Sequence, residues 1–297
     1  MTGQKGKRVT GHNRILHQHY AQIGAHGLLG LLLILIPSWL LSFTVEGDYK
    51  DLHTLLQSYV GVFHLSIAAF IFHHGVGRQP RPFIFARLLS SSFVLFTRLF
   101  AAYHLSEKST RGLLISDQFV LSSLILDGSW VASEMIRFVR EGGSSVIIMA
   151  EGRDFRKLEN ILYGDAFIAF SYAIFHYSFP QNILKLVIKP SIELDSHHYM
   201  WCRIFGALWF IPALSSLAAI ASFEKIQHAH LLSRLVIQVG IFALHIWGHW
   251  IDGVYSANHI TAFMISGFYM SFHISTFYRY NKGDAETNPA TRYKKQK

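Results

Sequence analysis

The sequence predicts an all-α protein: a multi-pass transmembrane helical bundle of eight spans, arranged as two parallel four-helix repeats. Its composition is the first indication, because 51% of the 297 residues are hydrophobic and only 15% are charged. A soluble domain carries about 25% charged residues, so this chain has too little charge to cover a soluble surface of its size. The second indication is the length of its apolar stretches, and the third is the placement of its basic residues.

The apolar stretches have the length that a bilayer requires. A hydrocarbon core about 30 Å thick is crossed by roughly 20 mostly apolar residues in a helix. The first stretch is kept as a span rather than a cleaved signal, since no small-residue cleavage site follows Pro37. A soluble bundle is disfavoured, because so many long apolar helices would leave little surface for water. The expected spans are 24–44, 54–74, 84–104, 113–134, 161–181, 200–222, 233–251 and 258–278.

Lysine and arginine gather in alternate loops, and such loops stay on the cytosolic side. The basic segments are the N-terminus, the loop after the second span, the central loop and the C-terminal tail, whereas the intervening loops are acidic or mixed. Both termini are therefore expected to be cytoplasmic. This bias accounts for the net charge of +9, so no nucleic-acid partner is expected. The predicted parts are a tail 1–23, a membrane unit 24–137, a linker 138–160, a second membrane unit 161–279 and a tail 280–297.

The last four residues point to a membrane compartment. Lys294 and Lys295 occupy the fourth and third positions from the end, as in the dilysine retrieval signal of endoplasmic reticulum membrane proteins. Such a signal is an address that a receptor reads, not an anchor. We therefore expect residence in the endoplasmic reticulum membrane, with the coat machinery binding the two lysines. A basic stop-transfer tail is the alternative interpretation.

Landmarks of the first four spans return in the last four. Pro37 and Pro180 lie near the ends of the first and fifth spans, and Arg87 and Arg234 lie at the start of the third and seventh. The period is about 144 residues, which indicates a tandem duplication. Four spans return the chain to its starting side, so the two copies have the same orientation. The linker holds a flexible Gly142-Gly143-Ser144-Ser145 turn.

The second unit carries a set of motifs over residues 160–283. They are Phe179-Pro180, then Arg203-Ile204-Phe205-Gly206-Ala207-Leu208, then Glu224-Lys225, and finally Phe277-Tyr278-Arg279-Tyr280. With these motifs the unit resembles the p53-inducible protein eleven family of small four-helix membrane proteins. The first unit matches more loosely and has His73-His74 where the Glu-Lys pair would fall. The resemblance implies a role in restraint of cell growth at internal membranes, without enzymatic activity, and it supplies no catalytic residues.

Polar residues at the depth of the membrane form the candidate site. Arg98 and Asp127 each lie about 15 Å from the cytosolic end of their spans, so they are expected to pair and offset each other's desolvation. In the second unit His245 and Tyr269 take their places, which predicts a neutral cluster there. One hypothesis is that the cluster only holds neighbouring helices together. The alternative is that it binds a polar head group, a proton or an ion. The predicted cluster is His64, Arg98, Asp127, His176, His245 and Tyr269.

Other polar residues are assigned to helix ends and to packing. Asp117, Glu134 and Asp165 lie near span ends, where they are expected to remain hydrated. Glu134 also has Arg137 three residues on, which predicts a pair on one helix face. Small residues such as Ser90, Ser91, Ser92, Gly30 and Gly206 suit close contact between helices.

The histidines raise the question of a metal or haem. His245 and His249 have the first spacing of a membrane di-iron hydroxylase, but the accompanying His-x2-His-His box is absent. His64 with His245 is the one pairing considered for haem. The single cysteine excludes a cysteine zinc site, and no nucleophile elbow, phosphate loop or dinucleotide motif is present. No metal, cofactor or catalytic residue is therefore assigned.

Three classes of function remain open. The leading hypothesis is a non-enzymatic membrane protein that acts in growth or stress regulation by binding membrane lipids or integral membrane protein partners within the bilayer. The second is a carrier of a small solute, ion or lipid through the mid-membrane polar site. The third is a histidine-dependent metal or haem oxidoreductase. A fold alone chooses none of them.

Overall fold

Helices account for nearly all of the structure, a computed structural model that describes residues 3–47, 49–76, 79–106, 114–115, 117–140 and 155–287. Two short strands, β1 (Val45–Glu46) and β2 (Leu114–Ile115), pair antiparallel. A single turn of π-helix, η1 (Trp247–Ile251), extends α9. The helices are α1 (Gly3–Leu35), α2 (Pro37–Thr44), α3 (Asp51–His74), α4 (Arg81–Ser106), α5 (Asp117–Arg140), α6 (Phe155–Ser178), α7 (Pro180–Val187), α8 (Ser196–Ile220), α9 (Glu224–Ile246) and α10 (His259–Thr287).

Proline sets the ends of the first helix in each half. α2 starts at Pro37 and α7 starts at Pro180, each directly after a long helix. Proline has no N–H to donate and disfavours the helical conformation of the residue before it, so the chain changes direction there. At Pro37 the two helix axes meet at 97°. The expected first span is thus a bent pair of helices.

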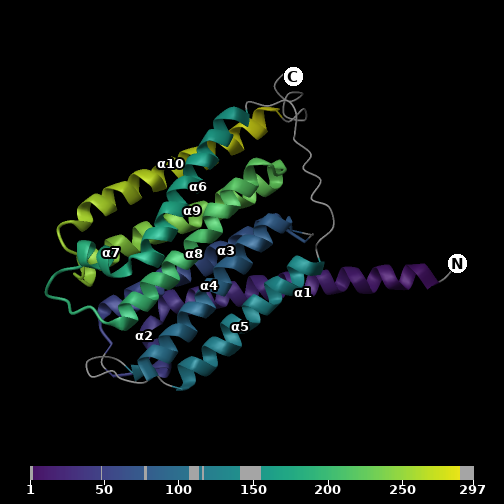
Figure 1. Ribbon diagram of the computed structural model, residues 1–297. Coiled ribbons are helices and arrows are strands. Elements are labelled where there is room, and N and C mark those ends of the chain that lie inside the picture. Colours follow the sequence, from purple (N-terminus) through teal and green to yellow (C-terminus); the bar gives the residue numbers. More distant parts are fainter. Residues whose placement is uncertain are drawn as a thin grey trace.

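The long helices lie side by side, and the two halves pack against each other along α3, α4, α8 and α9 (Figure 1). Within the halves, α1 packs on α3 and α4 on α5, as α6 packs on α8 and α9 on α10. Between the halves, α4 packs on α8 and α3 on α9. α3 and α8 are therefore central, and most of their residues are buried. The start of α1 and the end of α10 lie toward the same end of the bundle.

Small residues bring the helices of each half close together. A side-chain carbon added at Gly61 would lie 2.8 Å from the carbonyl oxygen of Gly30, where α1 crosses α3. One added at Gly206 would lie 2.5 Å from the backbone nitrogen of Tyr177, where α6 crosses α8. Ser90 donates to the carbonyl oxygen of Ala207 across the α4–α8 contact at 2.8 Å. The expected packing role is confirmed for Gly30, Gly206 and Ser90.

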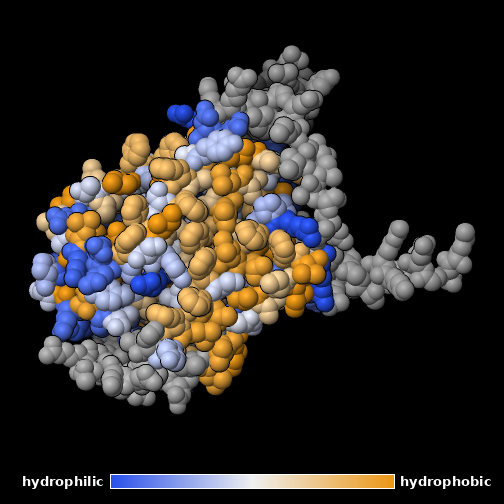
Figure 2. Space-filling model, viewed as in Figure 1, coloured by the Kyte–Doolittle hydropathy of each residue, from blue (hydrophilic) through white to orange (hydrophobic). Residues whose placement is uncertain are grey.

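Within the described residues, five helices are long and apolar enough to cross a membrane, or six if the bent α1–α2 pair is counted as one span. They are α3, α4, α8, α9 with η1, and α10. Large apolar side chains on the outside of the bundle are highly exposed; Phe167 and Phe268 reach 75% and 76%. In Figure 2, apolar residues cover the middle of the visible face, and hydrophilic residues gather toward its two ends. This distribution is compatible with a membrane protein and unusual for a soluble monomer.

The count of five or six differs from the eight expected spans, and the difference lies in α5 and α6. Both helices have membrane length, with 24 residues each. α5 contains Asp127 and Glu134, and α6 contains Asp165. Charged residues inside a helix lower its mean hydropathy.

Several boundaries also differ from the expected ones. α1 begins at Gly3, so most of the expected N-terminal tail is helical, and α9 begins at Glu224, ten residues before Arg234. Arg234 therefore lies inside a helix rather than at its cytosolic entrance. α5 and α6 extend into the expected linker, whose Gly142–Ser145 turn lies outside the described residues. α10 runs to Thr287, and Lys294 and Lys295 also lie outside the described residues.

Candidate functional site

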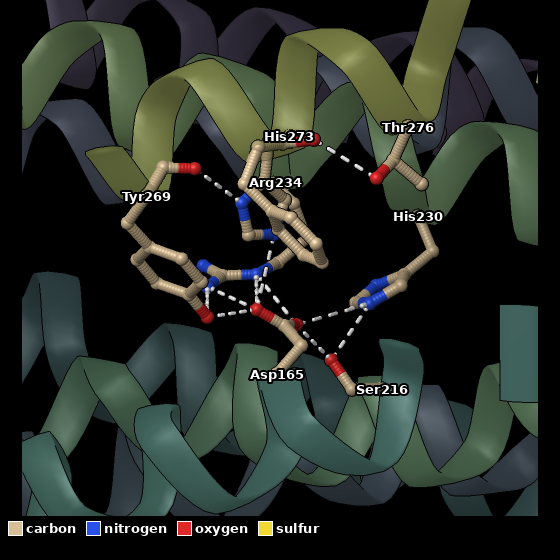
Figure 3. A network of polar contacts seen from close by, with 8 residues as sticks. Asp165, Ser216, His230, Arg234, Tyr269, His273 and Thr276 are labelled. Carbon is tan, nitrogen blue, oxygen red and sulfur yellow. Dashed lines mark hydrogen bonds and ion pairs between the residues drawn. The ribbon is translucent and has the colours of Figure 1, made fainter. Parts of the chain in front are cut away.

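A buried polar network joins four helices of the second half (Figure 3). Its centre is Asp165 on α6, which is 2% exposed. Arg234 on α9 approaches the carboxylate with two nitrogens, Nη2 to Oδ1 at 2.7 Å and Nε to Oδ2 at 2.8 Å. Ser216 on α8 and Tyr269 on α10 each donate a short hydrogen bond to Asp165. We call Asp165, Ser216, His230, Arg234, Tyr269 and His273 the Asp165 network.

The outer members of the network complete the contacts of its core. His273 Nε2 lies 3.0 Å from Asp165 Oδ1, and His230 Nε2 lies 2.9 Å from the Ser216 hydroxyl. Arg234 Nη2 donates to the Tyr269 hydroxyl at 2.9 Å and lies over the ring of Trp209. A buried carboxylate is stable only when charge and hydrogen bonds compensate its lost hydration. The network therefore works as a clamp that holds α10 on α6, α8 and α9.

The expectation that Asp165 and Glu134 remain hydrated is wrong. Glu134 is fully buried, and Arg87 Nε donates to its Oε1 at 2.9 Å. Arg87 also donates to Gln79 at 2.6 Å. Both acids point between helices, where an arginine from a neighbouring helix reaches them. The predicted pair of Glu134 with Arg137 is present as well, at 3.4 Å.

The predicted mid-membrane cluster separates into three places. Arg98 Nε lies 3.3 Å from Asp127 Oδ2, so the two residues that were expected to pair do so. The Arg98 guanidinium also lies over the rings of Phe119 and Trp201. His64 is not part of this pair: its Nδ1 lies 3.0 Å from Nδ1 of His26 on α1. His176, His245 and Tyr269 form the third group.

The Arg98–Asp127 pair gives a first prediction. Arg98→Ala should lower the free energy of unfolding by about 3 kcal/mol, because it leaves a buried carboxylate without its partner. The double variant Arg98→Ala, Asp127→Asn should lose less than the single variant, since no unpaired charge is left. Unfolding of the purified protein in detergent measures both. Simple addition of the two single effects would show that the pair carries no coupling energy.

The third group lines a cavity of about 100 Å³ that we call the histidine cavity. It lies among α3, α6, α7, α8, α9 and α10, and Tyr269 connects it to the Asp165 network. Several buried polar atoms around it have no hydrogen-bond partner among the described residues: Trp209 Nε1, Gln238 Nε2, His245 Nδ1, Ser266 Oγ and both ring nitrogens of His259. Such atoms are few in folded proteins. A cavity lined by several such atoms is suited to a ligand that forms hydrogen bonds.

Aromatic residues build one wall of the histidine cavity. The Tyr59 and Tyr255 hydroxyls lie 2.7 Å apart, and the Tyr255 ring stacks on His259 at 3.6 Å. Burial raises the pKa of the Tyr255 phenol above its ordinary value, so it keeps its proton at neutral pH. His249 stacks on the same His259 with ring centroids 6.0 Å apart. The wall therefore presents hydroxyl and imidazole groups on an apolar frame.

Sequence reasoning missed most of the Asp165 network and several polar residues of the cavity, among them Gln238, His259 and Ser266. A signal for them is present in the helical spacing. His230, Arg234 and Gln238 recur every four residues along α9, and Tyr269 and His273 do so on α10. Residues four apart share a helix face, so each of these faces carries a polar stripe through an apolar helix. A polar stripe of this kind predicts an inward face.

Among the described residues, one group of three has the ligand types and proximity of a metal site: His53, Asp195 and His198, with ligand atoms within 4.8 Å of one another. Hydrogen bonds already engage both ring nitrogens of His53 and Nδ1 of His198, whereas His198 Nε2 has no partner among the described residues. The backbone N–H of Lys50 donates to His53 Nδ1, which leaves Nε2 to donate to Asp195 Oδ2 at 3.0 Å. The backbone N–H of Asp195 donates to His198 Nδ1 in the same way.

The electrostatics of Asp195 agree with this arrangement. Burial alone would raise the pKa of its carboxyl, but hydrogen bonds with His198 and His53 hold it well below its usual range. The carboxylate also accepts from the backbone N–H of His198. Together these bonds cap the N-termini of α3 and α8 and tie the two helices together. The group is explained as a helix cap.

The fold and the site define an all-helical protein with several membrane-length apolar helices and a polar interior in its second half. The chain belongs to the family described as domain of unknown function DUF8292, whose model matches residues 20–277. The match spans both halves, from within α1 to near the end of α10. Searches of the curated proteins and of the solved structures gave no significant match.

Proposed function

We propose that the protein is a non-enzymatic, multi-pass membrane protein of the endoplasmic reticulum that binds a neutral lipid within the bilayer. The observation that carries the proposal is the histidine cavity, whose buried polar atoms lack partners inside a bundle with an apolar exterior. A buried polar group without a hydrogen bond costs about 1–3 kcal/mol. A ligand that supplies the missing hydrogen bonds recovers this free energy on binding.

The proposal includes eight spans in two repeats. Each half has the same order of elements: a long helix, an eight-residue helix that starts at proline, and three long helices. His53 and His198 cap α3 and α8 in the same way, and Gly61 and Gly206 mark the corresponding helix crossings. Parallel repeats of this kind occur in several transporter folds. The repeated landmarks support duplication of an ancestral four-span unit.

The charges of α5 and α6 are compatible with a place in the membrane. Asp127, Glu134 and Asp165 each pair with an arginine between helices. The outward face of α6 carries Phe167 and Phe175, and that of α5 carries Leu121 and Ile125, all more than half exposed. Intramembrane charges are expected to face the bundle interior and to pair with one another. Both helices therefore offer lipid an apolar face.

The lining of the histidine cavity indicates the chemical class of the ligand. It contains histidine, tyrosine, glutamine and serine among apolar residues, but no Asp, Glu, Lys or Arg. Such a lining gives an ionic head group no charge to pair with and suits a hydroxyl or carbonyl group. A volume of about 100 Å³ admits the polar end of a molecule, not a whole lipid. The ligand class is a lipid alcohol or ketone that inserts its polar end.

The test uses the full chain in phosphatidylcholine nanodiscs with a photoreactive sterol and a photoreactive diacylglycerol. At least one should label α9 or α10 saturably, because both helices line the cavity. His245→Phe and Gln238→Leu should each weaken labelling about tenfold, the effect of one buried hydrogen bond. His17→Phe, which removes an exposed histidine from α1, is the matched control and should have no effect. Equal labelling of His245→Phe and the unchanged protein would contradict the proposal, and so would equal labelling by photoreactive phosphatidylcholine.

The carrier alternative has support from the same cavity, because its size also suits a small solute. The histidine cavity is not lined by His64, Arg98 or Asp127, so a carrier would use the second half. Two results together would favour this alternative. The protein would carry a solute into sealed vesicles, with the flux abolished in Gln238→Leu, and no lipid probe would label it saturably.

Residence in the endoplasmic reticulum and a cytosolic C-terminus stay predictions that rest on Lys294 and Lys295 and on the basic loops. The coat machinery is the partner proposed for this tail. The likeness of the second unit to the p53-inducible protein eleven family stays a prediction too. On the basis of that likeness, we propose that lipid binding serves growth or stress regulation at internal membranes.

A further inference from the structure

A second cavity, of about 350 Å³, lies between α4, α6 and α8. Ser196, Tyr199 and Arg203 line it from α8 and recur three and four residues apart, so they share one helix face. The residues of α8 that line the histidine cavity, Cys202, Phe205 and Trp209, lie on another face. The two cavities are therefore separate places on α8. We call the second one the Arg203 cavity.

The Arg203 cavity has aromatic walls and one charge. Phe96 and Phe100 line it from α4, and Tyr177 lines it from α6. Both phenylalanines are more than half exposed, so this wall borders the exterior of the bundle. Arg203 is the one charged side chain in the lining. An apolar surface beside a single cation is complementary to an anionic amphiphile.

Arg203 differs from the other arginines in the interior of the bundle. Arg87, Arg98 and Arg234 each pair with a carboxylate. Arg203 is half-buried, and among the described residues it forms no ion pair and no hydrogen bond. An arginine within a membrane-spanning helix is costly and is normally paired or functional. The cavity beside Arg203 supplies the space in which an anion can lie.

The depth of Arg203 suits the head of a lipid. α8 begins at Ser196, and seven residues at 1.5 Å each place Arg203 about 10 Å along the helix. Head groups occupy several ångströms on each side of a hydrocarbon core about 30 Å thick. The guanidinium therefore lies near the boundary where acidic head groups meet acyl chains. The Tyr177 and Tyr199 hydroxyls belong to the same lining and add hydrogen-bond donors.

We propose that the Arg203 cavity binds an amphiphile with an acidic head, a carboxylate or a phosphate, whose acyl chain lies along Phe96 and Phe100. The head forms a charge-assisted pair with the guanidinium, which presents two parallel donors to two oxygens. This site is independent of the neutral-lipid site proposed above, since it uses other residues and a ligand of different charge. A free fatty acid and phosphatidic acid are the two sources of such a head.

The experiment measures binding of photoreactive oleic acid and of photoreactive phosphatidic acid to the full chain in phosphatidylcholine nanodiscs. At least one probe should label residues 96–101 or 196–203 saturably. The probe that labels more strongly identifies the acidic head group as a carboxylate or a phosphate. Arg203→Gln should weaken that labelling at least tenfold, whereas Arg203→Lys should keep most of it. Lys185→Gln, at an exposed cation on α7, is the matched control and should have no effect.

A second variant keeps the test decisive if Arg203→Gln fails to fold. Phe100→Trp fills the cavity from an exposed position with Arg203 intact, and it should also weaken labelling. Labelling of the histidine cavity by the neutral-lipid probe should survive in both variants, which separates this proposal from the neutral-lipid one. Unchanged labelling in Arg203→Gln, or equally strong labelling by photoreactive phosphatidylcholine, would overturn the proposal.

Discussion

Asp165→Asn should lower the free energy of unfolding by about 3–5 kcal/mol, the cost of removing one partner of a buried ion pair. Arg234 is 0% exposed, so its charge would stay in the interior without the carboxylate that compensates it. The substitution also weakens the bonds that join Asp165 to Tyr269 and His273 on α10. We expect α10 to loosen from α6, which hydrogen exchange of α10 would detect alongside thermal unfolding in detergent.

A double variant distinguishes the loss of the ion pair from a general defect. Asp165→Asn, Arg234→Met leaves no buried charge at this place and should be more stable than Asp165→Asn alone. Glu193→Ala, at an exposed acid outside the network, is the matched control and should change stability by less than about 0.5 kcal/mol. If the effects at positions 165 and 234 add within about 0.5 kcal/mol, the two residues do not act as a unit.

Gly206→Ala should destabilise the protein by about 3 kcal/mol or prevent its folding, because the new methyl group has no space. It would lie 2.5 Å from the backbone nitrogen of Tyr177 and 2.9 Å from the backbone carbon of His176. Backbone atoms of a packed helix cannot rotate away, so α6 and α8 must separate. Gly61→Ala should act in the same way on the crossing of α1 and α3.

Two other glycines of the bundle provide the controls for this prediction. Nothing lies within 4 Å of a side-chain carbon added at Gly128 or Gly164, which are in the interiors of α5 and α6. Alanine is favoured over glycine inside a helix by about 1 kcal/mol, so both substitutions should leave the protein as stable or make it more stable. A similar loss in Gly128→Ala and Gly206→Ala would show that the close crossing is not the cause.

Features that depend on position along one helix could be predicted from the sequence. The helical class and most of the long apolar helices follow from composition and length, whereas the break at Pro37 falls inside the expected span 24–44. Arg98 and Asp127 could be paired because equal depth on adjacent helices restricts which polar residues can meet. Glu134 and Arg137 could be paired because residues three apart share a helix face.

Features that depend on which helices are neighbours could not be predicted in this way. Asp165 and Glu134 were placed near helix ends by sequence distance, but they turn inward because Arg234 and Arg87 come to them from other helices. His64 shares the expected depth of Arg98, yet it contacts His26, since α1 packs on α3. The depth of a residue in the membrane restricts which residues it can contact along the membrane normal. It does not determine which helices are neighbours in the plane of the membrane.

The sequence by itself determined that this chain is helical and apolar, and it marked the polar positions at membrane depth. The tertiary structure decided that the two halves pack together through α3–α9 and α4–α8, and that the histidine cavity and the Arg203 cavity lie on different faces of α8. The physical reason is that hydropathy reports the cost of placing a residue in lipid. That cost is offset by hydrogen bonds and ion pairs with side chains on other helices, which can be distant in the sequence.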